Sequence, residues 1–178
     1  ALGLGHAVLC AEPLVAGEPF AVLLADDLMV GTPADGAVLT QMVRQFGQLG
    51  RSILAVQEVP AEHTRRYGIV AGHPVNDRML DIQRIVEKPA PEVAPSRLGV
   101  AGRYILTPGV FHEIATQPRG VGGEIQLTDG IAAAGAVIRL AFEKFDQLDR
   151  RATGIRVQRN HAQRRHDNAV ITLHLPID

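Results

Sequence analysis

Two adjacent carboxylates, Asp26 and Asp27, follow an apolar run at positions 20–25. The run predicts a strand buried on both faces, because it lies between Pro19 and the Gly-Thr-Pro breaker at 31–33. In open α/β sheets, ligands bind at the carboxyl ends of the strands, which is where these acids would stand. Magnesium binds through one or two carboxylates together with phosphate oxygens and water, so the pair suits that chemistry. The alternative is that both acids only end the strand and open a loop, since Asp favours turns.

A second pair, Glu87 and Lys88, ends a strand-like segment before Pro89. A carboxylate accepts hydrogen bonds from hydroxyl groups, and an ammonium attracts anionic groups, so the two side chains together offer an acceptor and a cation to a ligand. The alternative is an exposed ion pair without a ligand.

Successive side chains on a strand point to opposite faces, so only one of Asp26 and Asp27 is expected to face a given pocket.

Glycines at positions 3 and 5 precede an apparent helix. Glycine lets a backbone approach a ligand without a Cβ in the way, and a helix N-terminus offers free N–H groups. A dinucleotide fingerprint would need glycine where Val8 stands and a strand before it, which excludes the dinucleotide-binding oxidoreductases. His6 either belongs to the same site or is a surface residue that caps the helix.

Alternating helices and strands must position these residues. Apolar residues recur at spacings of three and four between Val38 and Leu49, which predicts an amphipathic helix ending at Gly50. Further helices are predicted over 6–14, after Pro108, and near 128–134 with Thr128 or Asp129 as N-cap. Strands are predicted at 20–25, 52–59, 67–72, 80–87 and 98–106. The fold class is therefore α/β, and the strict alternation gives way to a mixed sheet after residue 60.

The composition fits a globular domain with an aliphatic core. The 178 residues are 46% hydrophobic but only 4% aromatic, and tryptophan is absent. A formal net charge of -1 gives no general attraction to nucleic acid or to anionic membranes. Apolar stretches are too short for a membrane span, and the single Cys10 fits a reducing, cytoplasmic compartment.

The character of the chain changes after residue 135, where arginines gather between positions 150 and 165. No aromatic residue is interleaved with them, so a solvated tail is favoured over a segment that binds nucleic acid. His161 and His166 are five apart and lack a cysteine partner, so no zinc site is assigned. The predicted division is a domain at 1–135 and a divergent basic tail at 136–178.

Five motifs occur in one order: Gly-Leu-Gly-His-Ala at 3–7, Asp-Asp at 26–27, Tyr-Gly-Ile-Val at 67–70, Ile-Val-Glu-Lys-Pro at 85–89 and Gly-Gly-Glu-Ile-Gln-Leu-Thr-Asp at 122–129. Together they resemble the bacterial UTP–glucose-1-phosphate uridylyltransferases, a family of sugar nucleotidyltransferases, over residues 1–135. The resemblance implies a Rossmann-like α/β fold with a mixed, mostly parallel sheet, truncated at the N-terminus. It also implies UTP and glucose 1-phosphate as substrates, UDP-glucose and pyrophosphate as products, and Mg²⁺ as cofactor.

The resemblance assigns a role to the residues of each motif. The nucleotide-binding residues would be Gly3, Gly5 and His6. The sugar-binding residues would be Gly68, Glu87 and Glu124. The catalytic residues would be Asp26, which also holds the metal, and Lys88, which meets the sugar phosphate. Asp27 would be structural, and a plain helix entry capped by Asp129 is an alternative for the last motif.

The sequence departs from the family at both ends. The family begins with a glycine-rich loop containing Thr-Arg and a following Lys that wraps the triphosphate, and this loop would have to precede Ala1. An incomplete chain with severely reduced or absent activity is therefore expected. The family's second metal-binding aspartate lies in a Tyr/Phe-Asp-Cys-Gly motif, whereas this chain has Phe-Asp-Gln-Leu at 145–148, with Asp146 as a degraded counterpart.

Two alternatives to a uridylyltransferase stay open at this level. One is a non-catalytic remnant of the family that binds a sugar phosphate or a UDP-sugar. The other is a transferase for a different nucleoside triphosphate or sugar 1-phosphate. The resemblance further implies self-association into a homo-oligomer.

Overall fold

The structure is a computed structural model that describes residues 2–27, 29, 36–135, 137–141 and 170–174. Its strands are β1 (Phe20–Leu24), β2 (Ile53–Glu58), β3 (Gly68–Asn76), β4 (Met79–Glu87), β5 (Leu98–Leu106), β6 (Val137–Ala141) and β7 (Val170–His174). Its helices are α1 (Leu4–Leu9), α2 (Glu12–Val15), α3 (Val38–Leu49), α4 (Gly109–Thr116) and α5 (Leu127–Ala133), with short 3₁₀ turns at Ala61–Arg66 and Val121–Gly123.

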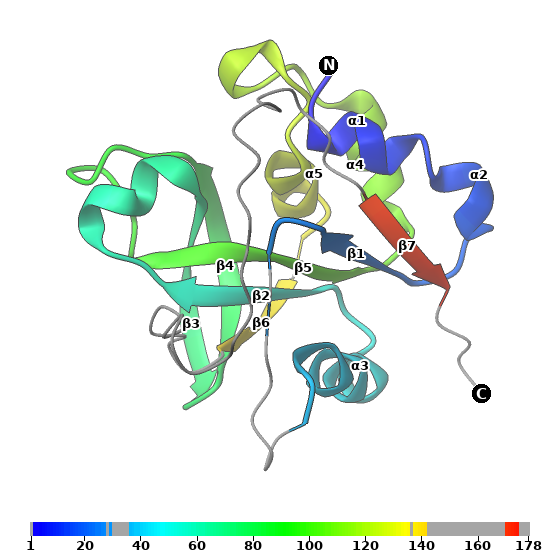
Figure 1. The fold of residues 1–178 in the computed structure, drawn as a ribbon, viewed down its shortest axis with the longest axis horizontal. Coiled ribbons are helices and arrows are strands. Elements are labelled where there is room, and N and C mark those ends of the chain that lie inside the picture. Colours follow the sequence, from blue (N-terminus) through cyan, green and yellow to red (C-terminus); the bar gives the residue numbers. More distant parts are fainter. Residues whose placement is uncertain (1, 28, 30–35, 136, 142–169, 175–178) are drawn as a thin grey trace, which may run out of the picture.

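The strands form one sheet in the order β2-β6-β4-β3-β5-β1-β7, and β2 also pairs with β5 (Figure 1). The long strand β5 therefore pairs with β1, β2 and β3. Both β6 and β7, which follow residue 135, join this sheet. The division into a domain at 1–135 and a tail stays a prediction, and the arginine-rich segment between positions 150 and 165 lies outside the described residues.

The α/β class is confirmed, but the expectation of a mostly parallel sheet is wrong. Among the described strands, β2 and β6 pair in parallel, and the other pairings are antiparallel. A short turn joins β3 to β4, and a chain that reverses so tightly must place its strands antiparallel. β1 and β2, which are joined through α3, both run antiparallel to β5 and so share one direction.

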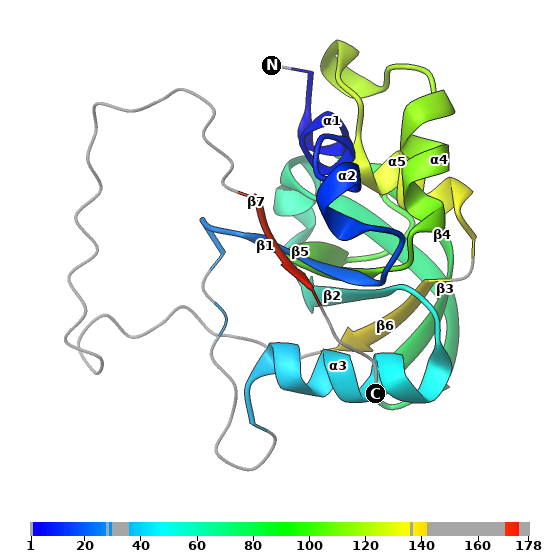
Figure 2. The same ribbon diagram turned by 90° about the vertical axis from the view of Figure 1, so that its right-hand side faces the viewer.

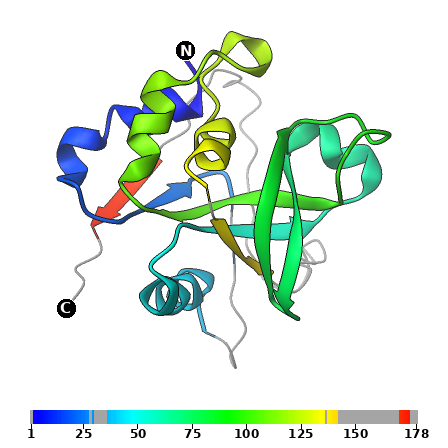
Figure 3. The same cartoon turned by 180° about the vertical axis from the view of Figure 1, so that it is seen from behind.

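Helices cover both faces of the sheet. Helices α1, α2, α4 and α5 lie on one side, and α3 lies alone on the other (Figure 2). From behind, the β3–β4 hairpin crosses the end of the sheet beside α5 (Figure 3). The layer under α3 buries Val38, Met42 and Phe46 against Ile53 and Ile105. Val38, Met42 and Phe46 belong to the apolar spacing from which α3 was predicted.

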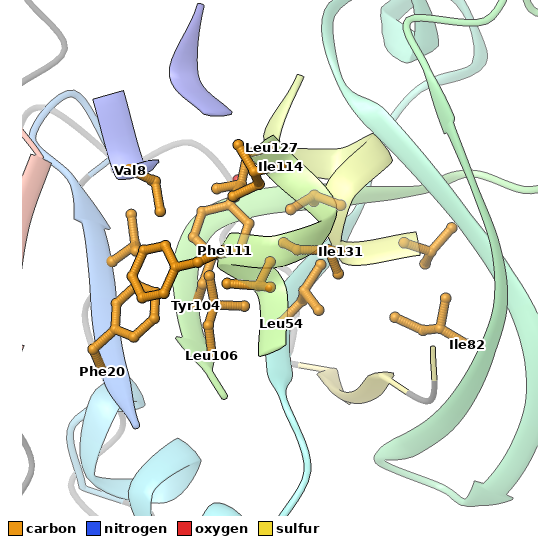
Figure 4. Close-up of a cluster of buried hydrophobic side chains, with 14 of the residues drawn as sticks. Val8, Phe20, Leu54, Ile82, Tyr104, Leu106, Phe111, Ile114, Leu127 and Ile131 are labelled. Atoms are coloured by element: carbon orange, nitrogen blue, oxygen red, sulfur yellow. The ribbon is translucent and has the colours of Figure 1, made fainter. Parts of the chain in front are cut away.

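The larger core lies between the sheet and the four-helix side (Figure 4). Phe20 of β1 and Phe111 of α4 stack with ring centroids 4.8 Å apart and ring planes 8° apart. Val8, Ile114 and Ile131 bring α1, α4 and α5 onto the same core. This packing fixes the first turn of α5 above the sheet, where the candidate site lies.

Two boundaries differ from the sequence expectations, and one agrees with them. The single helix predicted over 6–14 is split into α1 and α2, because Pro13 cannot donate the hydrogen bond that a continuous helix needs. The N-cap of α5 is Gln126 rather than Thr128 or Asp129. The predicted end of α3 is confirmed, since Gly50 caps it in the left-handed conformation with φ 61°.

We expect Gly47→Ala to raise the free energy of unfolding by ~0.8 kcal/mol, because alanine suits a helix interior better than glycine. Gly47 lies within α3, and a Cβ there would have no atom within 4 Å. The measurement is the urea midpoint. Gly50→Ala is the matched control and should lower the midpoint, since its φ of +61° strains alanine. A higher urea midpoint in both variants would contradict this account.

In the part of the chain that the structure describes, no helix combines the length and the apolar character that a membrane crossing requires.

Candidate active site

A cavity of about 380 Å³ opens beside the end of β1. Its walls come from the residues after β1, from the middle of β5, from the adjoining ends of β3 and β4, and from the first turn of α5. Three acids line it: Asp26, Asp27 and Glu87. Segments far apart in the sequence, from Leu4 to Thr128, therefore meet at one acidic cavity.

The predicted residues Asp26, Gly68 and Glu87 all line this cavity. Gly68 and Glu87 are paired across β3 and β4, so the glycine faces the carboxylate directly. Lys88 is outside the lining, but its Nζ lies 3.5 Å from Oε1 of Glu87. The structure thus brings together the four residues that the sequence placed in one site.

Asp27 also lines the cavity, so the expectation that only one of the two acids would face it is wrong. Strict alternation holds along a strand, whereas β1 ends at Leu24 and the acids follow in a turn. Asp27 is tied to β5: its Oδ2 accepts a hydrogen bond from the Gly102 N–H at 2.8 Å. The Arg103 guanidinium donates to the carbonyls of Asp27 and Leu24. These bonds support the structural role expected for Asp27.

Asp26 differs from its neighbour because it is exposed. Among the hydrogen bonds and ion pairs of the described residues, none involves its carboxylate. Its oxygens are therefore available to a ligand, whereas one oxygen of Asp27 is already used within the protein.

Glu87 is held on both carboxylate oxygens. Oε2 accepts a hydrogen bond from Thr128 Oγ1 at 2.8 Å, and Oε1 faces the Lys88 ammonium. Only 11% of the Glu87 side chain is exposed. Lys88 has a φ of 48°, and its N–H donates to the Tyr67 carbonyl at 3.0 Å.

Tyr104 of β5 is buried and lines the cavity. Burial raises the pKa of its hydroxyl, and the nearby charges of Glu87, Asp27 and Asp26 raise it further. The hydroxyl therefore stays protonated at neutral pH and can donate a hydrogen bond into the cavity. Burial, and next the charge of Glu87, likewise raise the pKa of Asp129.

The glycines at positions 3 and 5 lie outside the cavity lining, although Leu4 is part of it. A Cβ on Gly3 would lie 2.7 Å from the Ile125 carbonyl oxygen, and one on Gly5 would lie 2.8 Å from the same atom. The Gly5 N–H also donates to that oxygen at 2.9 Å. Close packing on Ile125 is therefore enough to require both glycines, and their contact with nucleotide stays a prediction.

Three further predicted residues lie away from the cavity or outside the description. His6 contacts the Cys10 Sγ at 3.8 Å through Nδ1. Glu124 is half-buried beside Gly3 and is outside the lining. Asp146 lies outside the described residues. Among those that are described, no three His, Cys, Asp or Glu side chains form a metal-binding group.

Sequence reasoning missed several residues of the cavity, namely Arg66, Gly102, Tyr104, Gln126 and Thr128. Three of them carried a signal, because Arg66 directly precedes the Tyr-Gly motif, and Gln126 and Thr128 lie inside the last motif. Gly102 and Tyr104 lie in an apolar strand, where their position beside the acids depends on strand pairing across the sheet.

The chain is similar to known nucleotidyltransferases. The sequence profile of the nucleotidyl transferase family matches residues 1–144. The UTP–glucose-1-phosphate uridylyltransferase of Pseudomonas aeruginosa is 48% identical over 149 residues, which cover 81% of this chain and 53% of that protein. UTP–glucose-1-phosphate uridylyltransferase 2 of Staphylococcus saprophyticus is 44% identical over 129 residues, covering 72% of this chain and 44% of that protein. The chain therefore spans about half the length of the curated relatives it matches.

Solved structures show the same similarity. A crystal structure of UDP-glucose pyrophosphorylase complexed with UDP-glucose matches with a TM-score of 0.76 and 41% identity, over 80% of this chain and 55% of that one. A UTP-bound enzyme of the same kind from Acinetobacter baumannii matches with a TM-score of 0.68 and 37% identity, over 80% and 50% of the two chains. Because the family profile spans residues 1–144 of the 178 and the fold agrees with these structures, the chain belongs to the nucleotidyl transferase family.

Proposed function

We propose that this chain is the part of a UTP–glucose-1-phosphate uridylyltransferase that binds the sugar phosphate and carries the metal-binding aspartate. The observation that supports this most is that Asp26, Gly68 and Glu87 line one cavity, with the Lys88 ammonium beside the Glu87 carboxylate. Such a site combines acceptors for hydroxyl groups with a cation for phosphate. The relatives that carry the UTP–glucose-1-phosphate name support the choice of substrates.

In the proposed reaction, a phosphate oxygen of glucose 1-phosphate attacks the α-phosphorus of UTP. The new bond joins that oxygen to the α-phosphorus, and the bond from the α-phosphorus to the bridging oxygen of pyrophosphate breaks. The nucleophile is already an anion, so no general base is required. The protein contributes by orienting the two substrates and by offsetting their charge.

Glu87 would hold the sugar by accepting hydrogen bonds from its hydroxyl groups. Gly68 lies opposite Glu87 in the sheet, so backbone rather than a side chain would lie beside the sugar ring. Lys88, whose side chain is 44% exposed, would reach the phosphate. Tyr104 would donate a hydrogen bond from the wall of the cavity.

Asp26 fits a magnesium ligand. Magnesium in nucleotide sites takes one or two protein carboxylates and completes its shell with phosphate oxygens and water. Asp26 offers an exposed carboxylate at the cavity and has no hydrogen bond or ion pair within the described part of the chain. When bound, the metal supplies neutralisation of phosphate charge. Asp146 stays a predicted second ligand.

A pyrophosphate-release assay with UTP, glucose 1-phosphate and magnesium tests the proposed function. Turnover with these substrates, and much less with other nucleoside triphosphates or sugar 1-phosphates, is the expected result. Thermal shift with UDP-glucose serves as the second measurement. Binding without turnover would favour the non-catalytic alternative. The absence of both binding and turnover would refute the proposal. A cytoplasmic location and a homo-oligomer are further expectations, which fractionation and size-exclusion chromatography would check.

Arg66 adds a cation to the cavity that the sequence motifs did not include. It lines the cavity next to Tyr67, whose carbonyl is hydrogen-bonded to the Lys88 N–H. We expect Arg66→Ala to raise the KM for glucose 1-phosphate about five- to tenfold, because a charge-assisted contact with phosphate is lost. Initial rates at fixed UTP measure this.

The adjacent Arg65 provides the matched control. It is exposed, lies outside the cavity lining, and places Nη2 3.8 Å from Glu92 Oε2. Arg65→Ala should leave the KM for glucose 1-phosphate unchanged. Equal effects of the two changes would mean that the chain's general positive charge, rather than a contact by Arg66, matters for the substrate.

A further inference from the structure

Thr128 lies in the first turn of α5 but does not serve the helix as a cap. The N-cap is Gln126, and no side chain caps this helix end. The Thr128 hydroxyl instead donates to Oε2 of Glu87 at 2.8 Å, across 41 positions of sequence. Thr128 is only 8% exposed, so its hydroxyl is directed inward at the cavity wall rather than toward solvent.

The threonine methyl group has a separate contact. A Cβ added to Gly68 would lie 2.8 Å from Thr128 Cγ2 and 3.2 Å from Glu87 Oε2. Gly68, Glu87 and Thr128 therefore form one packed group in which the hydroxyl meets the carboxylate and the methyl covers the glycine. The two contacts of Thr128 can be removed one at a time, because valine keeps the methyl and serine keeps the hydroxyl.

The hydroxyl limits how the Glu87 carboxylate can turn. The other oxygen, Oε1, is attracted by the Lys88 ammonium at 3.5 Å. Without the Thr128 donor, the carboxylate is free to rotate toward this cation. Each carboxylate oxygen accepts more than one hydrogen bond, so Oε2 can bind Thr128 and still accept from a sugar hydroxyl. A carboxylate fixed before the ligand arrives loses less freedom on binding.

We propose that Thr128 is a positioning residue, which orients the Glu87 carboxylate for the hydroxyl groups of the sugar phosphate. This inference rests on the proposed function, since it concerns the same cavity and the same substrate. It assigns to the final motif a role in the sugar site through Thr128 rather than through Glu124.

The test compares Thr128→Val with Thr128→Ser in steady-state kinetics. Loss of a hydrogen bond to a charged group predicts about a tenfold lower kcat/KM for glucose 1-phosphate in Thr128→Val. The KM for UTP should stay within about twofold, because the change acts at the sugar end of the cavity. Thr128→Ser should recover most of the loss, since it retains the donor.

Combination with Glu87→Gln separates positioning from a general structural role. If Thr128 acts through Glu87, Thr128→Val should cause little further loss in the Glu87→Gln background. Full additivity of the two losses would overturn the proposal. So would equal defects of the Val and Ser variants, which would place the effect in the methyl contact.

Thr116→Val is the control for the chemical change itself. Thr116 lies in α4, is exposed, and donates to the His112 carbonyl of its own helix at 2.9 Å. Its replacement should leave both KM values unchanged. The same series is measured by calorimetric binding of glucose 1-phosphate and of UDP-glucose. Wild-type protein that neither turns over nor binds would refute the proposed function, whereas normal wild-type behaviour with an unaffected Thr128→Val variant would refute this inference alone.

Discussion

Asp26→Ala is expected to lower the rate of UDP-glucose formation by about a hundredfold or more, because Asp26 is the proposed ligand of a magnesium ion that would offset the charge of the reacting phosphates. The fold should be unaffected, since Asp26 is exposed and its carboxylate forms no hydrogen bond or ion pair with the described residues. The measurement is pyrophosphate release at saturating substrate, together with the melting temperature. A loss of rate without a loss of stability would be the signature of a ligand-binding carboxylate.

The neighbouring acid supplies the control. Asp27→Ala removes the acceptor of the Gly102 N–H in a half-buried setting. It should therefore lower the free energy of unfolding by ~1–3 kcal/mol, the usual cost of an unsatisfied backbone donor. If Asp26→Ala retained near-normal turnover, the assignment of the metal to Asp26 would be wrong. If Asp26→Ala instead melted early, its carboxylate would have a structural role.

Gly102→Ala is expected to damage both stability and activity. A Cβ at this position would lie 2.3 Å from Asp27 Oδ2 and 2.7 Å from Leu24 Cβ. Overpacking of this kind costs ~1–3 kcal/mol and forces neighbouring groups to move. The groups that must move are the end of β1 and Asp27, which is next to Asp26. Turnover should therefore fall together with the urea midpoint.

Gly109→Ala is the appropriate comparison for that change. Gly109 begins α4, and a Cβ there would have no atom within 4 Å. It should leave activity unchanged and stability unchanged or slightly raised. Normal turnover in Gly102→Ala would show that the end of β1 adapts, and that the contact between β1 and β5 does not fix the cavity.

Local features of the fold were predictable because they depend on neighbouring residues. The spacing of Val38, Met42 and Phe46 identified α3, and Gly50 identified its end, since both signals lie within a few turns of one helix. The direction of strand pairing was not predictable in this way. Periodicity shows which face of a strand is buried, but a strand such as β5 has the same pattern whether its neighbours run parallel or antiparallel.

In the candidate site, too, the sequence predicted residue types but not the contacts between residues that are far apart along the chain. Asp26, Glu87 and Lys88 were identified by residue type and motif, and in the structure Asp26 and Glu87 line one cavity while the Lys88 ammonium lies beside Glu87. Thr128 or Asp129 was expected to cap α5, because both residue types are typical N-caps. The partner of Thr128, Glu87, is 41 positions away, and no local pattern reports such a contact. Predicting it requires knowing how β4 and α5 pack together.

The backbone of Lys88 determines which way its charge faces. In an ordinary strand, consecutive side chains leave from opposite sides, and a lysine after Glu87 would project away from it. The left-handed conformation at Lys88 breaks this alternation and allows the ammonium to swing back over the carboxylate. Such a conformation costs a residue other than glycine ~1 kcal/mol or more, and glycine could adopt it freely but has no charge. Lysine at this position therefore adopts a strained backbone conformation, and as a result its ammonium lies on the same side of the chain as the Glu87 carboxylate.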